Sequence, residues 1–254
     1  MPDEYVVQLD TFVSRFTEKL QAKDTSDLLS IIKSNPTTAC AEALAVAITN
    51  LAQKRPLEVD ALVLPIQALF DAAEAQSIQV YDYDDGSEPV TFHYVFILHL
   101  AEFVKDALHE TMLHTPKHTE ITPSNPTLAT ALFSASAIKH GLLANTSAPH
   151  NFTRQGLQLP ETGFDSPGEV ERQEVVAIGA CLHLYIAGAT MKNKLLFKGE
   201  DLLQSLRAIE KKRVISYAPG ITLLQHTIID AEGGFIHSDH FPANVWKELF
   251  PDQA

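Results

Sequence analysis

Four ionisable side chains between residues 99 and 109 have the types and the spacing that a metal site could use. His99, Glu102, Asp106 and His109 follow one another at intervals of three or four residues. In an α-helix, where each residue advances by about 100°, they share one face, opposite Val104. Imidazole and carboxylate ligands on helices are typical of iron, manganese and zinc sites in bundles. No second helical segment offers a clear Glu-x-x-His pair, so a solvent-exposed polar face explains the same pattern.

A second group of possible ligands lies near the C-terminus. His226, His237, Asp239 and His240 are close in sequence and follow or adjoin expected turns. Zinc accepts three such ligands and a water molecule, and His237 and His240 would be the first candidates. Their spacing matches no zinc module, so histidines carried on surface turns are the alternative interpretation.

The familiar catalytic and binding motifs are not found in this sequence. His109, Glu110 and His114 resemble the metalloprotease motif H-E-x-x-H, but the second histidine is one position too late to share the face. The acidic stretch Asp82–Gly86 lacks the spacing of an EF-hand loop. No Walker A, dinucleotide-binding or nucleophile-elbow motif occurs. We therefore assign no catalytic residue and predict no cofactor.

The stretch from Ser166 to Asn193 predicts the central helix of the molecule. Ser166 and Glu169 have the spacing of a capping box, and Val175–Met191 contains a single ionisable side chain, His183. A helix that is apolar nearly all round is buried nearly all round, and we expect His183 to be a core histidine with its hydrogen bonds satisfied. The run is at the short limit for a bilayer, about 17 residues, and no second run accompanies it. We predict a buried helix and no membrane span.

Helical periodicity also appears in most of the remaining chain. Apolar residues at intervals of three and four predict helices over residues 5–20, 28–35, 38–54, 57–76, 87–112, 126–141, 200–212 and 243–250. Between the last two, Val214–Tyr217, Ile221–Ile229 and Phe235–His237 are rich in β-branched and aromatic residues and are separated by Pro-Gly and Gly-Gly pairs. The sequence thus predicts a mainly α fold, an irregular multi-helix bundle or degenerate helical array, with a small C-terminal antiparallel β hairpin or sheet.

Length and composition favour a single packed domain. A chain of 254 residues with 45% hydrophobic residues can bury a large core. No sequence pattern recurs at a fixed period, and the stretch 145–165, which lacks periodicity, is the best position for a subdomain boundary. Cys40 and Cys181 both lie in apolar helical patterns, which indicates buried free thiols.

The charge of the chain is acidic overall and uneven along the sequence. The net charge is −13, which argues against a nucleic-acid or anionic-membrane surface. The segment Lys192–Arg213 nevertheless has seven basic and three acidic residues, a net charge of +4, which leaves −17 on the rest. A local basic strip on an acidic body suits a protein partner or an anionic small molecule.

These observations favour a soluble helical scaffold or adaptor that binds another macromolecule. The first residues, Met1–Glu4, have neither the cationic nor the apolar region of a secretory signal, so we expect a cytoplasmic protein. The alternative is a helical-bundle enzyme, or a small-molecule or metal-binding protein, whose polar site is formed by the four side chains between His99 and His109.

Overall fold

The computed structural model describes residues 2–21, 27–80, 89–114, 120–143, 148–157, 174–192, 199–236 and 240–253. Within these ranges the chain forms eleven α-helices, two short 3-10 helices and one two-stranded antiparallel sheet, which confirms the mainly α prediction. The elements in chain order are α1 (Pro2–Gln21), α2 (Leu28–Ser34), α3 (Thr38–Lys54), η1 (Pro56–Glu58), α4 (Val59–Ala75), β1 (Gln79–Val80), β2 (Val90–Thr91), α5 (Phe92–His114), α6 (Pro126–Lys139), α7 (Ala148–Gly156), α8 (Glu174–Met191), α9 (Gly199–Lys211), α10 (Ala218–Glu232), α11 (Pro242–Leu249) and η2 (Pro251–Gln253).

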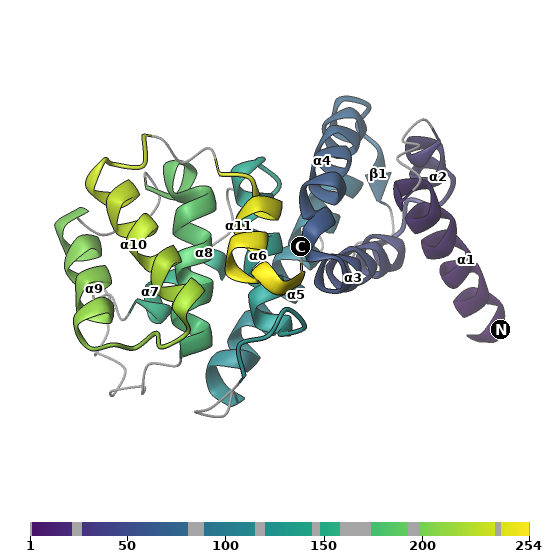
Figure 1. The fold of residues 1–254 in the computed structure, drawn as a ribbon. Coiled ribbons are helices and arrows are strands. Elements are labelled where there is room, and N and C mark those ends of the chain that lie inside the picture. The colour runs from purple at the N-terminus through teal and green to yellow at the C-terminus, as the bar shows by residue number, and fades with distance from the viewer. Residues whose placement is uncertain are drawn as a thin grey trace.

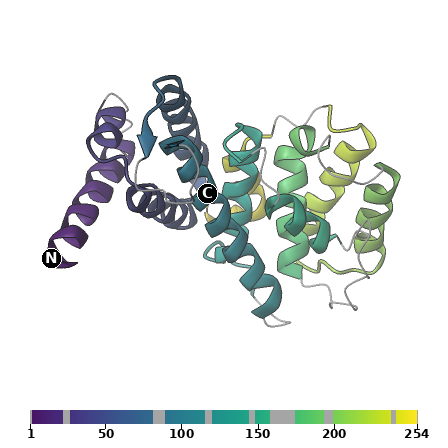
Figure 2. The same ribbon diagram turned by 180° about the vertical axis from the view of Figure 1, so that it is seen from behind.

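The helices form an elongated array. Figures 1 and 2 show α1 and α2 at one end and α9 and α10 at the other, with α5 and α6 between them. The last helix, α11, does not extend the array but returns to its middle, where it contacts η1, α4 and α6 as well as α10. The C-terminal helix therefore connects parts of the chain that are far apart in sequence.

Several helices begin where the local sequence supplies a cap. The Thr37 side chain accepts a hydrogen bond from the Cys40 amide at 3.2 Å and so satisfies an N–H group in the first turn of α3. Asn125 does the same for α6, accepting from the amides of Thr127 and Leu128 at 3.0 and 3.3 Å, and Pro126 follows at the first helical position. Both boundaries agree with the sequence-based predictions.

The centre of the core is the pair α6 and α8, which pack side by side. The side chains from Thr127 to Ile138 of α6 are buried, and so are those from Val175 to Gly188 of α8. Among the described residues α8 is the one helix long and apolar enough to cross a membrane, but 83% of it is buried inside the protein. The prediction of a helix buried almost all round is confirmed, while the proposed capping box at 166–169 lies outside the described residues.

The predicted C-terminal β hairpin is wrong, because Ile221–Ile229 lies within α10. Leu223, Leu224, Thr227 and Ile228 bury one helical face, and this tertiary packing outweighs the preference of β-branched residues for strands. The Pro-Gly pair at 219–220 stands in the first turn of the helix, where proline is tolerated. The Gly-Gly pair at 233–234 follows its last turn, with Gly234 at a φ of +68°.

The strands of the described chain lie elsewhere, before and after the acidic stretch at 81–88. Gln79 pairs with Thr91 and Val80 with Val90, and this short hairpin leads directly into α5.

A further difference concerns the loop predicted at 145–165. Residues 148–156 form helix α7, and Phe152 and Thr153 are buried against the core. The acidic stretch itself and residues 158–173 lie outside the described residues.

Candidate functional site

The face of α5 that has the spacing of a possible metal site is mostly open to solvent. Glu102, Asp106 and His109 are exposed, whereas His99 is half-buried and its Nε2 atom has no hydrogen-bond partner. Across the described residues, no three His, Cys, Asp or Glu side chains lie close enough together to hold a metal ion. The four side chains therefore share a face, but no ligand from another described helix joins them. A metal at this face stays the alternative to a solvent-exposed polar face, and elemental analysis of untagged protein would test it.

The second predicted group is only partly placed. His237 and Asp239 lie outside the described residues, but His240 is described and has a carboxylate partner that the sequence did not indicate. Its Nε2 atom is 2.8 Å from Asp230 Oδ2, and its ring stacks on Tyr185 with 3.6 Å between the ring centroids. The imidazole of His226 lies 5.9 Å from the same tyrosine ring. Burial, together with the nearby negative charges of Glu248 and Asp230, raises the pKa of Tyr185.

A second histidine–aspartate pair lies at the C-terminal end of α6. His140 Nε2 is 3.4 Å from Asp60 Oδ1, and the buried Ser136 hydroxyl donates to the same oxygen at 2.6 Å. These three residue types also form catalytic triads, but there the histidine contacts the serine. Here the carboxylate stands between them, so His140 is not placed to take the proton of Ser136. The arrangement joins α4 to α6 and activates no nucleophile.

Lys139 connects the two pairs. Its ammonium group donates to the backbone carbonyl of His240 at 2.9 Å and lies 5.1 Å from the centre of the Phe241 ring. The end of α6 is thus fixed to the residues that precede α11. The two histidine–aspartate pairs consequently flank the place where the C-terminal helix returns to the array.

His183 is fully buried at the centre of the core, and both ring nitrogens have hydroxyl partners. Ser134 Oγ lies 2.5 Å from Nε2 and Thr153 Oγ1 lies 2.8 Å from Nδ1, while Phe152 meets the ring edge-on. Burial, reinforced by the nearby imidazole of His150, lowers the pKa of His183 to about 3. The prediction of a core histidine with its hydrogen bonds satisfied is confirmed. This polar group joins α6, α7 and α8 without contact with solvent.

Neither cysteine is placed for reaction. Cys40 and Cys181 are free and buried, as the sequence predicts. Burial raises the pKa of the Cys181 thiol to about 12, although a hydrogen bond with Thr227 opposes the shift. Because the thiolate is the reactive form, this side chain is inert at neutral pH.

Several large apolar side chains of the described residues are exposed to solvent. Seven such residues are exposed by 40% or more: Leu57, Leu64, Tyr94, Leu98, Ile229, Ile236 and Phe241. The last three occur within thirteen residues of sequence, and the Asp230–His240 hydrogen bond draws together the immediate neighbours of Ile229 and Phe241. We call Ile229, Ile236 and Phe241 the C-terminal apolar surface.

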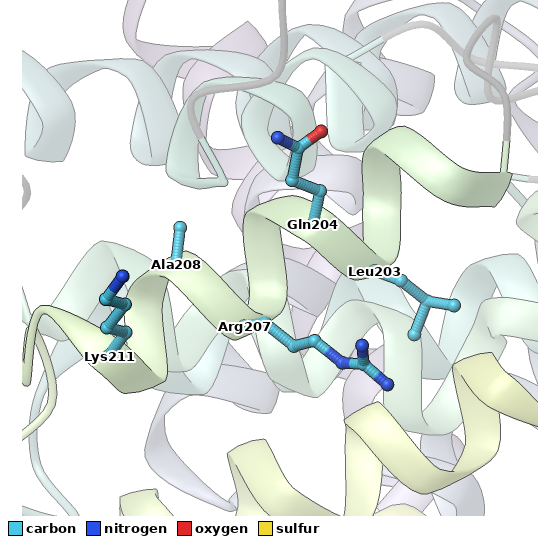
Figure 3. Close-up of a pocket in the computed structure, with 5 residues that line it drawn as sticks. All are labelled: Leu203, Gln204, Arg207, Ala208 and Lys211. Carbon is cyan, nitrogen blue, oxygen red and sulfur yellow. The ribbon is translucent and has the colours of Figure 1, made fainter.

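Among the depressions on the surface of the described chain, one lies on α9 and another lies beside α1 and α2. The larger, of about 470 Å³, lies along α9 and is lined by Leu203, Gln204, Arg207, Ala208 and Lys211 (Figure 3). The smaller, of about 330 Å³, lies between α1 and α2 and is lined by Arg15, Lys19, Asp27, Ser30, Ile31 and Ser34. Neither lining contains a histidine or cysteine, and neither holds the predicted α5 residues.

Comparison with known proteins adds no assignment to this geometry. No family model, no curated protein and no solved structure matches the chain.

Proposed function

We propose that this chain is a helical scaffold or adaptor that acts in the cytoplasm by binding another protein. The observation that carries the proposal is the C-terminal apolar surface, where Ile229, Ile236 and Phe241 are 63%, 76% and 63% exposed. Single exposed apolar residues are ordinary, but here three large ones occur within thirteen residues, and the Asp230–His240 hydrogen bond lies beside two of them, which favours an interaction site. Aromatic side chains such as Phe241 are enriched at protein interfaces, and a few well-packed side chains supply most of the binding energy there.

Some of the described residues next to this surface are held to the rest of the protein. Phe235 is buried against Gly188 of α8 so closely that a Cβ atom at position 188 would overlap its ring. The Lys192 ammonium donates to the carbonyl of Gly234, and His240 bonds to Asp230. Residues that are already ordered lose less conformational entropy on binding.

The proposal is tested by isolating the protein from its native cells after mild cross-linking. We compare the natural chain with a variant carrying Ile229→Ser, Ile236→Ser and Phe241→Ser. The control variant carries Leu64→Ser, Tyr94→Ser and Leu98→Ser, which removes three exposed apolar side chains from α4 and α5.

We expect one protein to be recovered in near-stoichiometric amount with the natural chain and with the control, and to be lost with the C-terminal variant. The loss of three exposed interface anchors should weaken binding at least about a hundredfold, because each anchor contributes about 1 kcal/mol or more. Recovery of the chain alone, or of the same partner with all three proteins, would remove the proposal.

A further inference from the structure

Helix α9 lies at one end of the array and packs mainly on α10 (Figure 1). Leu202, Leu206 and Ile209 form its buried face. Its other side is not covered by a further described helix, and Arg207 and Lys211 are exposed there. The end of the array therefore presents a helical surface that has apolar and cationic side chains together.

The depression along this surface has a definite chemical character. Leu203 and Ala208 contribute apolar groups, while Arg207 and Lys211, one helical turn apart, contribute cations (Figure 3). Arg207 also forms an ion pair with Glu232 of α10, with 2.5 Å between the two atoms. This pair holds the arginine side chain in place. A guanidinium has five N–H donors, so Arg207 can bind a second carboxylate while it is paired with Glu232.

The distribution of charge indicates what would bind here. The described residues 207–213, at the C-terminal half of α9 and just after it, have four basic side chains and one acidic side chain, a net charge of +3, whereas the rest of the chain has −16. A negatively charged partner is therefore attracted locally to this part of an otherwise acidic molecule. A nucleic acid typically needs about 6–10 phosphate contacts for tight binding, but only two cations line this depression.

We propose that the α9 depression docks an acidic amphipathic segment of a partner protein. Carboxylates one helical turn apart on that segment pair with Arg207 and Lys211, and an apolar side chain between them contacts Leu203 and Ala208. The inference rests on the proposed function of the chain as a protein-binding scaffold, but it concerns a different surface from the C-terminal apolar surface.

The test uses the full chain and a synthetic helical peptide in which leucine and glutamate occupy adjacent faces. Binding of the fluorescein-labelled peptide is followed by fluorescence anisotropy at low and at physiological salt. A peptide with lysine in place of every glutamate is the charge control. Vesicles that contain phosphatidylserine and a single-stranded oligonucleotide are the alternative anionic probes.

Three variants make the test specific. The first carries Arg207→Gln and Lys211→Gln, and its matched control carries Lys33→Gln and Lys105→Gln, two exposed cations on α2 and α5. Both lose two positive charges, so their net charges are equal. The third, Ala208→Asp, places a carboxylate in the depression and leaves the Arg207–Glu232 pair intact.

We expect the acidic peptide to bind the natural chain and the matched control equally, and to bind the other two variants about tenfold more weakly. Equal binding to all four proteins, equal binding of the lysine peptide, or tighter binding of vesicles or oligonucleotide would overturn the inference. Those results leave the isolation experiment on the C-terminal apolar surface unaffected. Failure of that experiment would in turn leave peptide binding unchanged, so the two proposals fail separately.

Discussion

At the scale of single residues, His183 shows how a polar group is accommodated in the core. A neutral imidazole carries one N–H group, so one ring nitrogen donates and the other accepts. The hydroxyl of Ser134 also lies 3.1 Å from the Ala131 carbonyl, and that of Thr153 lies 2.9 Å from the Pro149 carbonyl. Each hydroxyl can therefore serve the ring or its own helix. The neutral ring is fully hydrogen-bonded, and burial opposes its protonation.

This arrangement predicts a specific loss of stability in acid. The pKa of His183 falls from its ordinary value of 6.5 to about 3 on folding. Between these pH values the imidazole is therefore protonated in the unfolded chain and neutral in the folded chain. Protonation of this group costs the folded protein nothing above pH 6.5. As the pH falls from 6.5 towards 3, the free energy of unfolding decreases by about 1.4 kcal/mol per pH unit.

The measurement is the free energy of unfolding in urea at several pH values, for the natural chain and for His183→Gln. The amide can keep hydrogen bonds to the hydroxyls but does not titrate in this range. We expect the difference in stability between the two proteins to shrink as the pH falls below about 6. Two curves that stay parallel down to pH 4 would contradict the prediction.

His183 also shows how much of a buried polar site could be predicted from the sequence. Its position in an apolar helix indicates a buried histidine, because few other roles are compatible with such neighbours. Its partners could not be predicted, since Ser134 and Thr153 lie 49 and 30 residues away in sequence. Thr153 also belongs to α7, a helix of only nine residues whose buried side includes Pro149, His150 and Gly156, so few apolar residues mark it in the sequence.

At the scale of elements, the local caps of α3 and α6 helped to predict where these helices begin, whereas α10, whose first turn is held by a distant residue, was not predicted as a helix. Thr37 and Asn125 precede the helices that they cap, so α3 and α6 are visible in the sequence. The N-terminus of α10 has no side-chain cap of its own. Instead Glu174, at the start of α8, accepts hydrogen bonds from the amides of Ser216 and Tyr217 at 2.6 and 2.7 Å. Without that tertiary contact, the β-branched residues of α10 indicate a strand.

The hydrogen bonds of Glu174 to the residues before α10 should contribute measurably to the stability of the protein. Glu174→Ala leaves the two amides before α10 without their carboxylate and removes a negative charge from the positive end of both helices. We expect the free energy of unfolding in urea to fall by about 1–2 kcal/mol. The control is Glu210→Ala, an exposed glutamate on α9, for which a change below about 0.5 kcal/mol is expected. Equal losses in the two variants would show that Glu174 acts only as a surface charge.

At the scale of the whole molecule, the arrangement depends on contacts that no local pattern records. The amphipathic repeats predict most helices, but they do not say that α11 returns to η1, α4 and α6. The same is true of the α5 face. The spacing of His99 and His109 places them on one side of a helix, but it does not show whether another helix brings further ligands to that side. The C-terminal apolar surface could not be predicted either. Ile229 and Phe241 are of residue types that are usually buried, and only the packing of their neighbours shows that they are exposed.

The returning helix predicts that the array unfolds as a unit. Trp246 is the only tryptophan of the chain, is 2% exposed and lies in α11, so its fluorescence reports on this helix alone. Circular dichroism at far-ultraviolet wavelengths instead reports on all helices. Because α11 contacts elements from both halves of the chain, its release should require the disruption of the array on both sides. We expect the two signals to change at the same urea concentration. A fluorescence transition at lower urea would show that α11 detaches from an array that remains folded.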